Sequence, residues 1–455
     1  MSTRDATDPE AAEAAEVCAE VAAAGWRWVL AQVRWDDGPW IPESVPHAGA
    51  PPDERDGTHS GVGGLALVLA ELALARAWTP QEAELADAVA TRVRAGLGAT
   101  DDCSAFDGLV SAVGSLTALD APGAEDAVAR LAALAGPDGW GQSVLGAPYP
   151  DGTRISDATL GTAGVLLGAV WARRQRVRGA DDLARHAADV LLAEAEPADV
   201  GRLWRFVPLR FLDHVAPEER REMPNWSHGV AGIAGALAVA GAALDRPDLV
   251  AAARSGAEHL LSWADTGDGG LVVPRVVPPR PAGPVEVSYG WCHGPTGTAL
   301  LFEALGLAGV EEVAGLAPGA WRRRCLRSVA ASGVPQRREP GAWDNDGRCC
   351  GTAGVGDAAL DSWQRHGDEA DLALARACGD ALVERAVLDG PHAWWRFVEH
   401  RAPDPLLPPG VGWMQGAAGI AAYLARLARV LREGREAPAV ARLDSWWALP
   451  RPVRR

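Results

Sequence analysis

The sequence predicts an all-α protein of the α/α-toroid class, in which about seven helical hairpins form a double ring. Three observations support this prediction. A glycine motif recurs along the chain of 455 residues, amphipathic stretches separate its copies, and hydrophobic residues make up 48% of the composition, enough for a substantial core. Because the repeats run through nearly the whole chain, we expect a single domain over residues 1–455.

The repeated element is a small-residue turn with the pattern Gly-x-x-Gly, which runs directly into an apolar helical stretch. Successive copies start about 45 to 70 residues apart, which is enough for two helices and a loop. One copy alone would indicate only close helix packing, but a series at this spacing indicates a repeated architecture. The copies start at His59, Leu160, Ser227, Cys292, Cys349 and Met414, with a degraded copy at Phe106.

The segments between the motifs supply the other elements in order. Residues 14–28 read as an amphipathic N-terminal helix, and Ala/Arg/Glu-rich stretches read as the outer helices. These outer-helix stretches are 80–97, 181–193 and 370–387. The loops that precede several motifs carry Pro, Gly and Trp, and two of them, 201–226 and 269–291, predict short β segments.

Composition excludes several classes of protein. The formal net charge of -17 argues against nucleic acid as a partner, because binding nucleic acid normally needs a basic surface. Residues 1–16 are acidic and Ala-rich rather than a signal peptide, and no apolar run is long enough to span a membrane. Seven cysteines, an odd number without a secretion signal, indicate reduced thiols and a cytoplasmic protein.

Cys292, Cys349 and Cys350 lie at or beside the helix start of two successive repeats. Equivalent positions of neighbouring repeats converge in a ring, so these thiols can meet and form a soft-metal site. Zinc is the ion expected, because catalytic zinc sites combine three protein ligands with an open position. We expect His293 to be a hydrogen-bonding neighbour of this site that takes part in catalysis, rather than a fourth ligand. The cysteines outside the motifs, predicted to be buried small hydrophobes, are Cys18, Cys103, Cys325 and Cys378.

His228 and Asp157 occupy comparable places in other repeats. His228 immediately precedes the first glycine of its copy, and Asp157 lies four residues before Gly161. A histidine beside a metal site is the usual general acid or base, and a carboxylate within reach would orient it. We therefore predict that both take part in catalysis.

Three tryptophans, Trp226, Trp291 and Trp413, each lie within two residues of a motif. If the motifs line one end of the ring, their indoles surround its mouth and contact a flexible peptide or another apolar ligand. The alternative is that these indoles fill the core behind the loops.

The motifs WSHGVAG at Trp226, GWCHGPTG at Gly290 and RCCGTAG at Arg348, preceded by DATLGTAG at Asp157, resemble the lanthionine synthetase C-like proteins. The resemblance implies a zinc-containing α/α toroid that adds peptide cysteine thiols to dehydroalanine or dehydrobutyrine, giving lanthionine or methyllanthionine rings. It implies that the three motif cysteines hold zinc. It also implies that the proton donor is His228, with Asp157 in support. A separate dehydratase, or a kinase and lyase, would have to supply the dehydrated precursor peptide.

The sequence departs from the family in two places. Cys350 stands where histidine is more common, giving the three-cysteine set of one branch. Stand-alone bacterial cyclases often carry Arg four residues before the first zinc cysteine and Tyr just after it, where this chain has Ser288 and His293. Tyr289 and Arg348 are the candidates to supply the missing group, Tyr289 in catalysis and Arg348 in binding substrate.

Three other functions compete with a cyclase. A glycosidase would use paired carboxylates from Asp157, Asp344 and Asp346, but it would leave the motif cysteines unexplained. A zinc-stabilised scaffold would bind modified peptides without catalysis. An enzyme that adds a small thiol to dehydrated proteins would use the same zinc chemistry as a cyclase.

Overall fold

The computed structural model describes residues 9–46, 55–142, 146, 148–150, 152–279, 286–336, 345–398 and 406–442. These ranges contain fourteen α-helices, three short 3-10 helices and six short strands, so the predicted all-α class is confirmed. The described residues group into two compact units, one within 1–89 and 334–441 and the other within 90–333 together with Arg442. Whether they make one domain, as the repeats predict, stays a prediction.

Each unit is built from consecutive helices. The first unit contains α1 (Pro9–Gln32), α2 (Gly63–Ala73), α12 (Thr352–His366), α13 (Glu369–Arg385) and α14 (Ala417–Glu433). The second unit contains α4 (Leu109–Ala118), α5 (Ala124–Leu134), α6 (Thr162–Arg174), α7 (Ala180–Ala193), α8 (Val230–Leu244), α9 (Pro247–Leu261), α10 (Pro295–Leu307) and α11 (Pro318–Ala331). Helix α3 (Pro80–Gly96) begins in the first unit and ends in the second unit.

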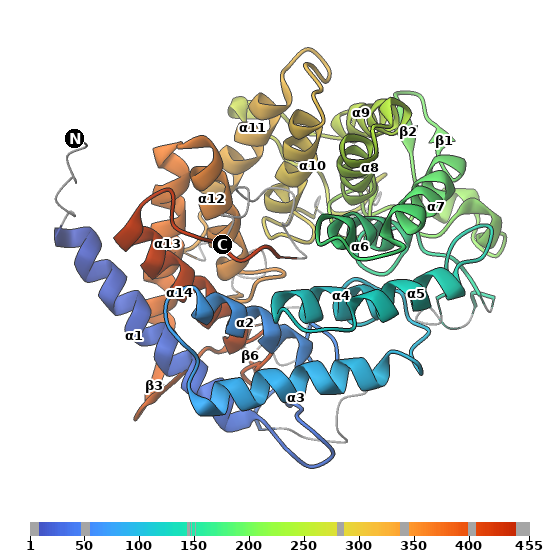
Figure 1. Cartoon of the computed structure of the whole chain (residues 1–455). Helices are drawn as coiled ribbons and strands as arrows, with labels where there is room; N and C mark the ends of the chain where they lie inside the picture. The colour runs from blue at the N-terminus through green and yellow to red at the C-terminus, as the bar shows by residue number, and fades with distance from the viewer. Residues whose placement is uncertain are drawn as a thin grey trace, which may run out of the picture. The chain divides into compact units, whose positions relative to one another are not determined.

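A helix follows every copy of the glycine motif, including the degraded copy at Phe106. These motif helices are α2, α4, α6, α8, α10, α12 and α14. Within the second unit α8 contacts both α6 and α10, and within the first unit α14 contacts both α12 and α2. Most motif helices pack against the helix that follows them, for example α8 against α9 and α12 against α13 (Figure 1).

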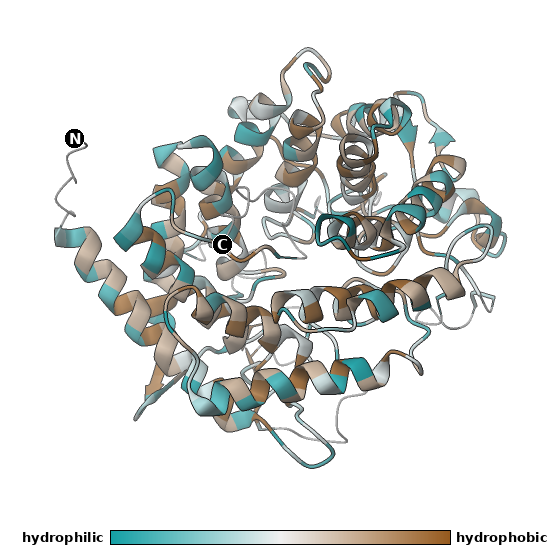
Figure 2. Cartoon of the chain, in the orientation of Figure 1, coloured by the Kyte–Doolittle hydropathy of each residue, from teal (hydrophilic) through white to brown (hydrophobic). Residues whose placement is uncertain are grey.

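Hydropathy separates the two kinds of helix. Motif helix α8 is apolar around almost its whole circumference and is buried along nearly all of its length, as expected for a helix with neighbours on every side. Outer helices α3 and α7 alternate hydrophilic and hydrophobic residues along their length (Figure 2), because only one face of each is covered.

The strands are short and lie in loops that lead to motif helices. Of the two predicted β segments, 201–226 contains β2, whereas the described part of 269–291 forms only isolated bridges at Val272 and Val277. The antiparallel pairs are β1 (Glu196–Pro197) with β2 (Arg202–Leu203), β3 (Val387–Asp389) with β4 (His392–Trp394), and β5 (Phe397–Val398) with β6 (Leu406–Leu407). The 3-10 helices are η1 (Leu209–Phe211), η2 (Pro217–Glu219) and η3 (Gly267–Gly269).

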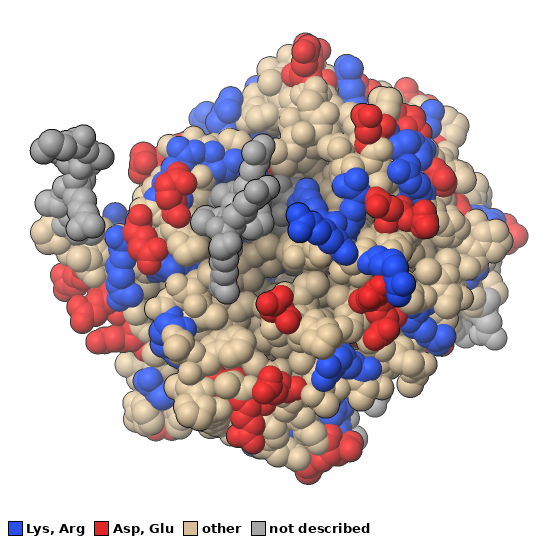
Figure 3. Space-filling view, in the orientation of Figure 1, with Lys and Arg blue, Asp and Glu red and all other residues tan. Residues whose placement is uncertain are grey.

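The surface carries charges of both signs. Acidic side chains and arginines, which are the only basic residues apart from histidine, intermingle over the face drawn in Figure 3. Among the described helices, none combines the length and the apolarity that crossing a bilayer requires.

Candidate metal centre and acid–base site

The predicted functional residues lie in the turns that immediately precede the motif helices. In each turn of this kind the chain folds back against the first helical residues. The first turn of the helix therefore has no room for a side chain where the two backbones meet. A Cβ atom at Gly232 would collide with the carbonyl oxygen of Trp226, and one at Gly297 would collide with the carbonyl oxygen of Trp291. The second glycine of the motif is therefore needed for the turn to close.

Two of these turns are joined directly in the second unit. The main-chain N–H of Ser227 donates to the carbonyl oxygen of Cys292 at 2.9 Å. The following residues, His228 and His293, have ring centroids 5.3 Å apart at an interplanar angle of 41°. The bond between the two turns therefore brings the predicted acid–base histidine beside the turn that carries the first predicted zinc ligand.

Asp157 holds the His228 ring. One carboxylate oxygen, Oδ2, lies 2.6 Å from Nδ1 of His228, and the other, Oδ1, accepts the main-chain N–H of Leu160 at 2.7 Å. The Asp157 side chain is completely buried, whereas that of His228 is 25% exposed. A fixed carboxylate on Nδ1 leaves Nε2 as the nitrogen available to a substrate.

Thr159 is a site residue that we did not predict. Its hydroxyl lies 2.9 Å from Oδ2 of Asp157 and 3.1 Å from Nδ1 of His228, so it touches both members of the pair. The signal for it was a hydroxyl two residues after the aspartate in the motif DATLG. Local hydrogen bonds from Thr to a nearby Asp are common in turns, but the sequence does not show that the same hydroxyl also reaches a histidine 69 residues away.

Phe206 closes one side of this pair. Its ring meets the His228 ring edge-on at 5.6 Å between centroids. The Phe206 carbonyl accepts the main-chain N–H of Ser156, next to Asp157, at 2.9 Å. The loop after β2 is thus hydrogen-bonded to the segment that carries Asp157.

Cys349 and Cys350 occupy the corresponding turn of the first unit. Their sulfur atoms lie 3.4 Å apart. The main-chain N–H groups of Arg348 and Cys349 both donate to the carbonyl oxygen of Met414, at 2.8 and 3.0 Å, which anchors this turn to the next motif.

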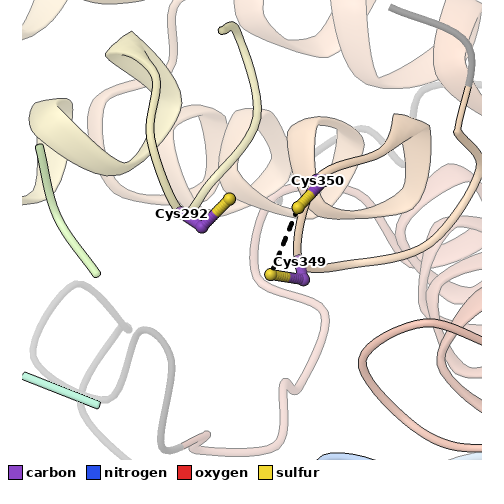
Figure 4. A group of neighbouring side chains, drawn as sticks. All are labelled: Cys292, Cys349 and Cys350. Atoms are coloured by element: carbon purple, nitrogen blue, oxygen red, sulfur yellow. Dashed lines mark hydrogen bonds between the residues drawn. The ribbon is translucent and has the colours of Figure 1, made fainter. Parts of the chain in front are cut away.

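The three motif cysteines form a group with the ligand type and spacing of a metal site. The sulfur atoms of Cys292, Cys349 and Cys350 lie within 4.8 Å of one another. Figure 4 shows all three, with the contact between Cys349 and Cys350 as a dashed line. Thiol sulfurs at this spacing suit a borderline-soft ion such as zinc.

The remaining cysteines are buried, as predicted: Cys18, Cys103, Cys325 and Cys378. Burial raises the pKa of the Cys18 thiol to about 12 and raises the pKa of the other three further. These thiols stay protonated and behave as apolar side chains.

Three predicted substrate contacts are corrected by the structure. The side chains of Trp226, Trp291 and Trp413 are 1%, 5% and 2% exposed. Trp226 packs against Gly235, and Trp291 meets Phe106 edge-on at 5.6 Å. These indoles therefore fill the core behind the loops, which was the alternative interpretation.

The predicted contact of Arg348 with substrate is corrected as well. Arg348 is 2% exposed, and its guanidinium group pairs with Asp357 at 2.5 Å and stacks 4.1 Å from the ring centre of Trp413. A buried, paired guanidinium group is not available to a peptide. These contacts instead hold Arg348 in place directly before Cys349.

The other predicted residues are placed as follows. Tyr289 is half-buried, and its carbonyl accepts the hydroxyl of Thr296 at 2.7 Å; a catalytic role for it stays a prediction. Asp346, a carboxylate of the glycosidase alternative, is buried and paired with Arg385 at 2.9 Å. The other such carboxylate, Asp344, lies outside the described residues.

Comparison with known proteins points to one family. A sequence model of the family "Lanthionine synthetase C-like protein" matches residues 52–433, which is most of the chain. No curated protein sequence matches.

Solved structures support the fold. The chain is similar to nisin cyclase with a TM-score of 0.56 and 13% sequence identity, over 82% of this chain and 88% of that one. This likeness of fold confirms the predicted α/α-toroid class. A cellobiose 2-epimerase from Spirochaeta thermophila aligns at a TM-score of 0.48 and 13% identity, over 94% of this chain and 100% of that one, which is too distant to carry an argument.

Proposed function

Because the chain belongs to the lanthionine synthetase C-like family, we propose that it is a zinc-dependent peptide cyclase. It would add cysteine thiols of a dehydrated precursor peptide to dehydroalanine or dehydrobutyrine, giving lanthionine or methyllanthionine rings. The observation that carries the proposal is the group of three cysteine sulfurs, because a glycosidase does not need it and three protein ligands leave a zinc ion one open position for a substrate thiol.

The sulfur atoms fit a zinc ion. Zinc–sulfur bonds of about 2.3 Å in a tetrahedron place two sulfurs about 3.8 Å apart. The sulfurs of Cys349 and Cys350 are 3.4 Å apart, and Cys292 lies within the 4.8 Å limit of both. When bound there, zinc would supply the Lewis acidity that holds an incoming cysteine as its thiolate. Without the metal, a thiol with a pKa of about 8.5 is mostly protonated at neutral pH.

His228 would handle the proton of the reaction. The thiolate sulfur forms a bond to the β-carbon, the electrons of the carbon–carbon double bond move to the α-carbon as an enolate, and one proton must reach that carbon. Nε2 of His228 would donate it, and Asp157, whose Oδ2 lies 2.6 Å from Nδ1, would stabilise the positive ring. The proton that the cysteine thiol loses equals the one that the α-carbon gains, so no further reactant is needed.

His293 and Tyr289 would assist from the neighbouring turn. The His293 ring lies 5.3 Å from that of His228, and His293 is buried. We propose that His293 borders the reacting peptide and that Tyr289 contributes a hydroxyl group beside it. We also propose that the enzyme acts in the cytoplasm, after a separate dehydratase, or a kinase and lyase, has dehydrated the precursor.

Metal analysis tests the centre of this proposal. Elemental analysis of protein purified without chelator should find about one zinc per chain, and Cys292→Ala should lose it. Cys325→Ala is the matched control, because Cys325 is equally buried but belongs to no motif. A well-folded wild-type protein without zinc would refute the cyclase mechanism.

Activity distinguishes the three zinc-based functions. A dehydrated model peptide that contains its own cysteine should lose free thiol with no change of mass when the enzyme closes a ring. The His228→Ala variant should slow this loss by about a hundredfold or more, the usual contribution of a general acid. Addition of glutathione alone would indicate intermolecular thiol transfer, and binding without turnover would indicate a scaffold.

A further inference from the structure

A pocket of about 540 Å³ lies against the turn that carries His228. Its lining comes from the segment after β2, from the chain that follows η2, from the end of α9 and from residues 277–279, all in the second unit. A volume of this size is in the range that holds a ligand of several residues or a drug-sized molecule. None of the predicted catalytic residues lines it.

The lining is cationic, although the chain as a whole has a net charge of -17. It contains three arginines and a single carboxylate, that of Glu222. Arg205 is neutralised between Glu196 and Glu222, at 3.0 and 3.1 Å. His259 adds no charge near pH 7, because burial lowers its pKa despite the carbonyl of Val200 beside it. Arg220 therefore supplies positive charge to this lining.

Arg220 is the arginine best placed to bind an anion. Its Nε and one terminal nitrogen donate to the carbonyl oxygens of Val215 and Leu212, at 3.1 and 3.3 Å, and it makes no ion pair with a described carboxylate. The two carbonyl bonds fix the guanidinium group, and no carboxylate among the described residues neutralises its charge. A fixed guanidinium group with spare N–H donors is the usual partner of a carboxylate.

The rest of the pocket is apolar and suits a peptide rather than a small anion. Proline rings and the half-buried indole of Trp263 line it beside Arg220. The indole N–H of Trp263 has no hydrogen-bond partner among the described residues. An aromatic face with a spare donor next to a cation fits an acidic residue flanked by apolar side chains.

Residues on either side of the acid–base turn also line the pocket. Pro224 and Val230 line it and lie on either side of the turn that holds His228. Arg205 also lines it, and the next residue, Phe206, contacts the His228 ring. A peptide segment held here would enter the reaction site from a fixed point.

We propose that this pocket binds an acidic, apolar-flanked segment of the peptide substrate, separate from the residues that react. That the ligand is the substrate of this protein rests on the proposed function. That the pocket binds an acidic peptide does not. The pocket would raise the local concentration of the reacting cysteine and dehydroamino acid by tethering the same chain.

Fluorescence anisotropy tests the site with a fluorescein-labelled peptide of alternating glutamate and leucine residues. The wild-type protein should bind it, and Arg220→Glu should weaken binding by about tenfold or more, the effect of losing one charge-assisted contact. Trp263→Ala should also weaken it. Arg254→Glu, on the same helix α9 as His259 but outside the pocket, is the charge control and should bind as the wild type does.

Further variants keep the outcome interpretable. Arg220→Lys retains the charge and should bind within a few-fold of the wild type, which guards against a loss of folding in Arg220→Glu. The same peptide with glutamine for glutamate should bind much more weakly. Equal binding of the glutamine peptide, unchanged binding by Arg220→Glu, or complete displacement by inorganic phosphate would overturn the proposal.

The experiment is repeated with Cys292→Ala to separate this site from the zinc centre. Peptide binding that persists in this variant supports the pocket even if the protein proves to contain no zinc. If the wild-type protein binds zinc and closes rings, but Arg220→Glu binds the peptide as well as the wild type does, the peptide-binding pocket is refuted while the proposed function stands.

Discussion

At the scale of single residues, Asp157 and Thr159 together determine which nitrogen of His228 carries the proton. The hydroxyl has one proton to donate, and its two other neighbours, Oδ2 of Asp157 at 2.9 Å and the carbonyl oxygen of Ser227 at 3.3 Å, can only accept. Its oxygen can therefore interact with Nδ1 of His228 only as an acceptor. Nδ1 thus faces two acceptors and carries the proton, which leaves Nε2 for the substrate.

Removing this hydroxyl should slow ring closure without unfolding the protein. Thr159→Val keeps the shape of the side chain, and we expect a rate about five- to tenfold lower, since one hydrogen bond of about 1 kcal/mol is lost. Thr159→Ser should restore most of the rate. Nitrogen-15 NMR of the imidazole should show a smaller share of the Nδ1–H tautomer in the valine variant. An unchanged tautomer population there would contradict this role.

Sequence patterns located Asp157 and His228 but not the details of their contact. Both residues precede a motif glycine, so equivalence of the repeats predicted their proximity, and they lie 2.6 Å apart across 71 positions of chain. The direction of the indole at Trp226 could not be predicted in this way. Spacing places a residue in a turn, but packing against Gly235 decides that this ring points into the core.

At the scale of elements, the start of α3 shows how a buried charge is stabilised. Thr79 precedes the helix and Glu82 is its third residue, and each side chain bonds to the main-chain N–H of the other. Trp26 and Arg76 also donate to the Glu82 carboxylate. Burial by itself would raise the pKa of Glu82, but these hydrogen bonds outweigh it and lower the pKa to about 2.

The contribution of Glu82 to stability should disappear in acid. Its pKa is near 4.5 in the unfolded chain and about 2 in the folded one, so the stabilisation is complete above pH 4.5 and is lost as the pH falls towards 2. Glu82→Gln should lower the free energy of unfolding by about 3 kcal/mol at pH 7. Urea denaturation at several pH values should show this difference shrinking below pH 4.5.

The matched control is Glu84→Gln, which changes an exposed glutamate of the same helix. It should leave the free energy of unfolding at pH 7 unchanged within about 0.5 kcal/mol. A gap between wild type and Glu82→Gln that stays constant down to pH 2 would contradict the assignment.

The sequence predicted helix positions well because the motif carries its own start signal. The range 80–97 was expected and α3 spans Pro80–Gly96, and a helix follows even the degraded motif at Phe106. The tertiary partner of the N-terminal helix was not predictable. Its amphipathic pattern shows that one face is covered, but not which helix covers it.

At the scale of the whole molecule, the two ends of the described chain are joined within the first unit. Helix α1 packs along α14, so the last motif helix takes its partner from the N-terminus (Figure 1). The contact is close at Gly25, where a Cβ would lie 3.0 Å from the ring of Trp395 and 3.4 Å from the Cβ of Ala421. The sequence model of the family begins at residue 52 and therefore leaves out α1.

Disrupting this contact should destabilise the protein, although the change lies outside every copy of the glycine motif. Gly25→Leu places a large side chain against Trp395 and α14, and we expect a loss of about 1–3 kcal/mol in the free energy of unfolding, as for other overpacked cores. Ala23→Leu introduces the same side chain on the exposed face of α1 and should change stability little. A chain that starts at residue 33 should aggregate, because it exposes the apolar face of α14. Equal stability of the two leucine variants would contradict close packing of α1 at Gly25, and a soluble, folded chain that starts at residue 33 would show that α1 is dispensable.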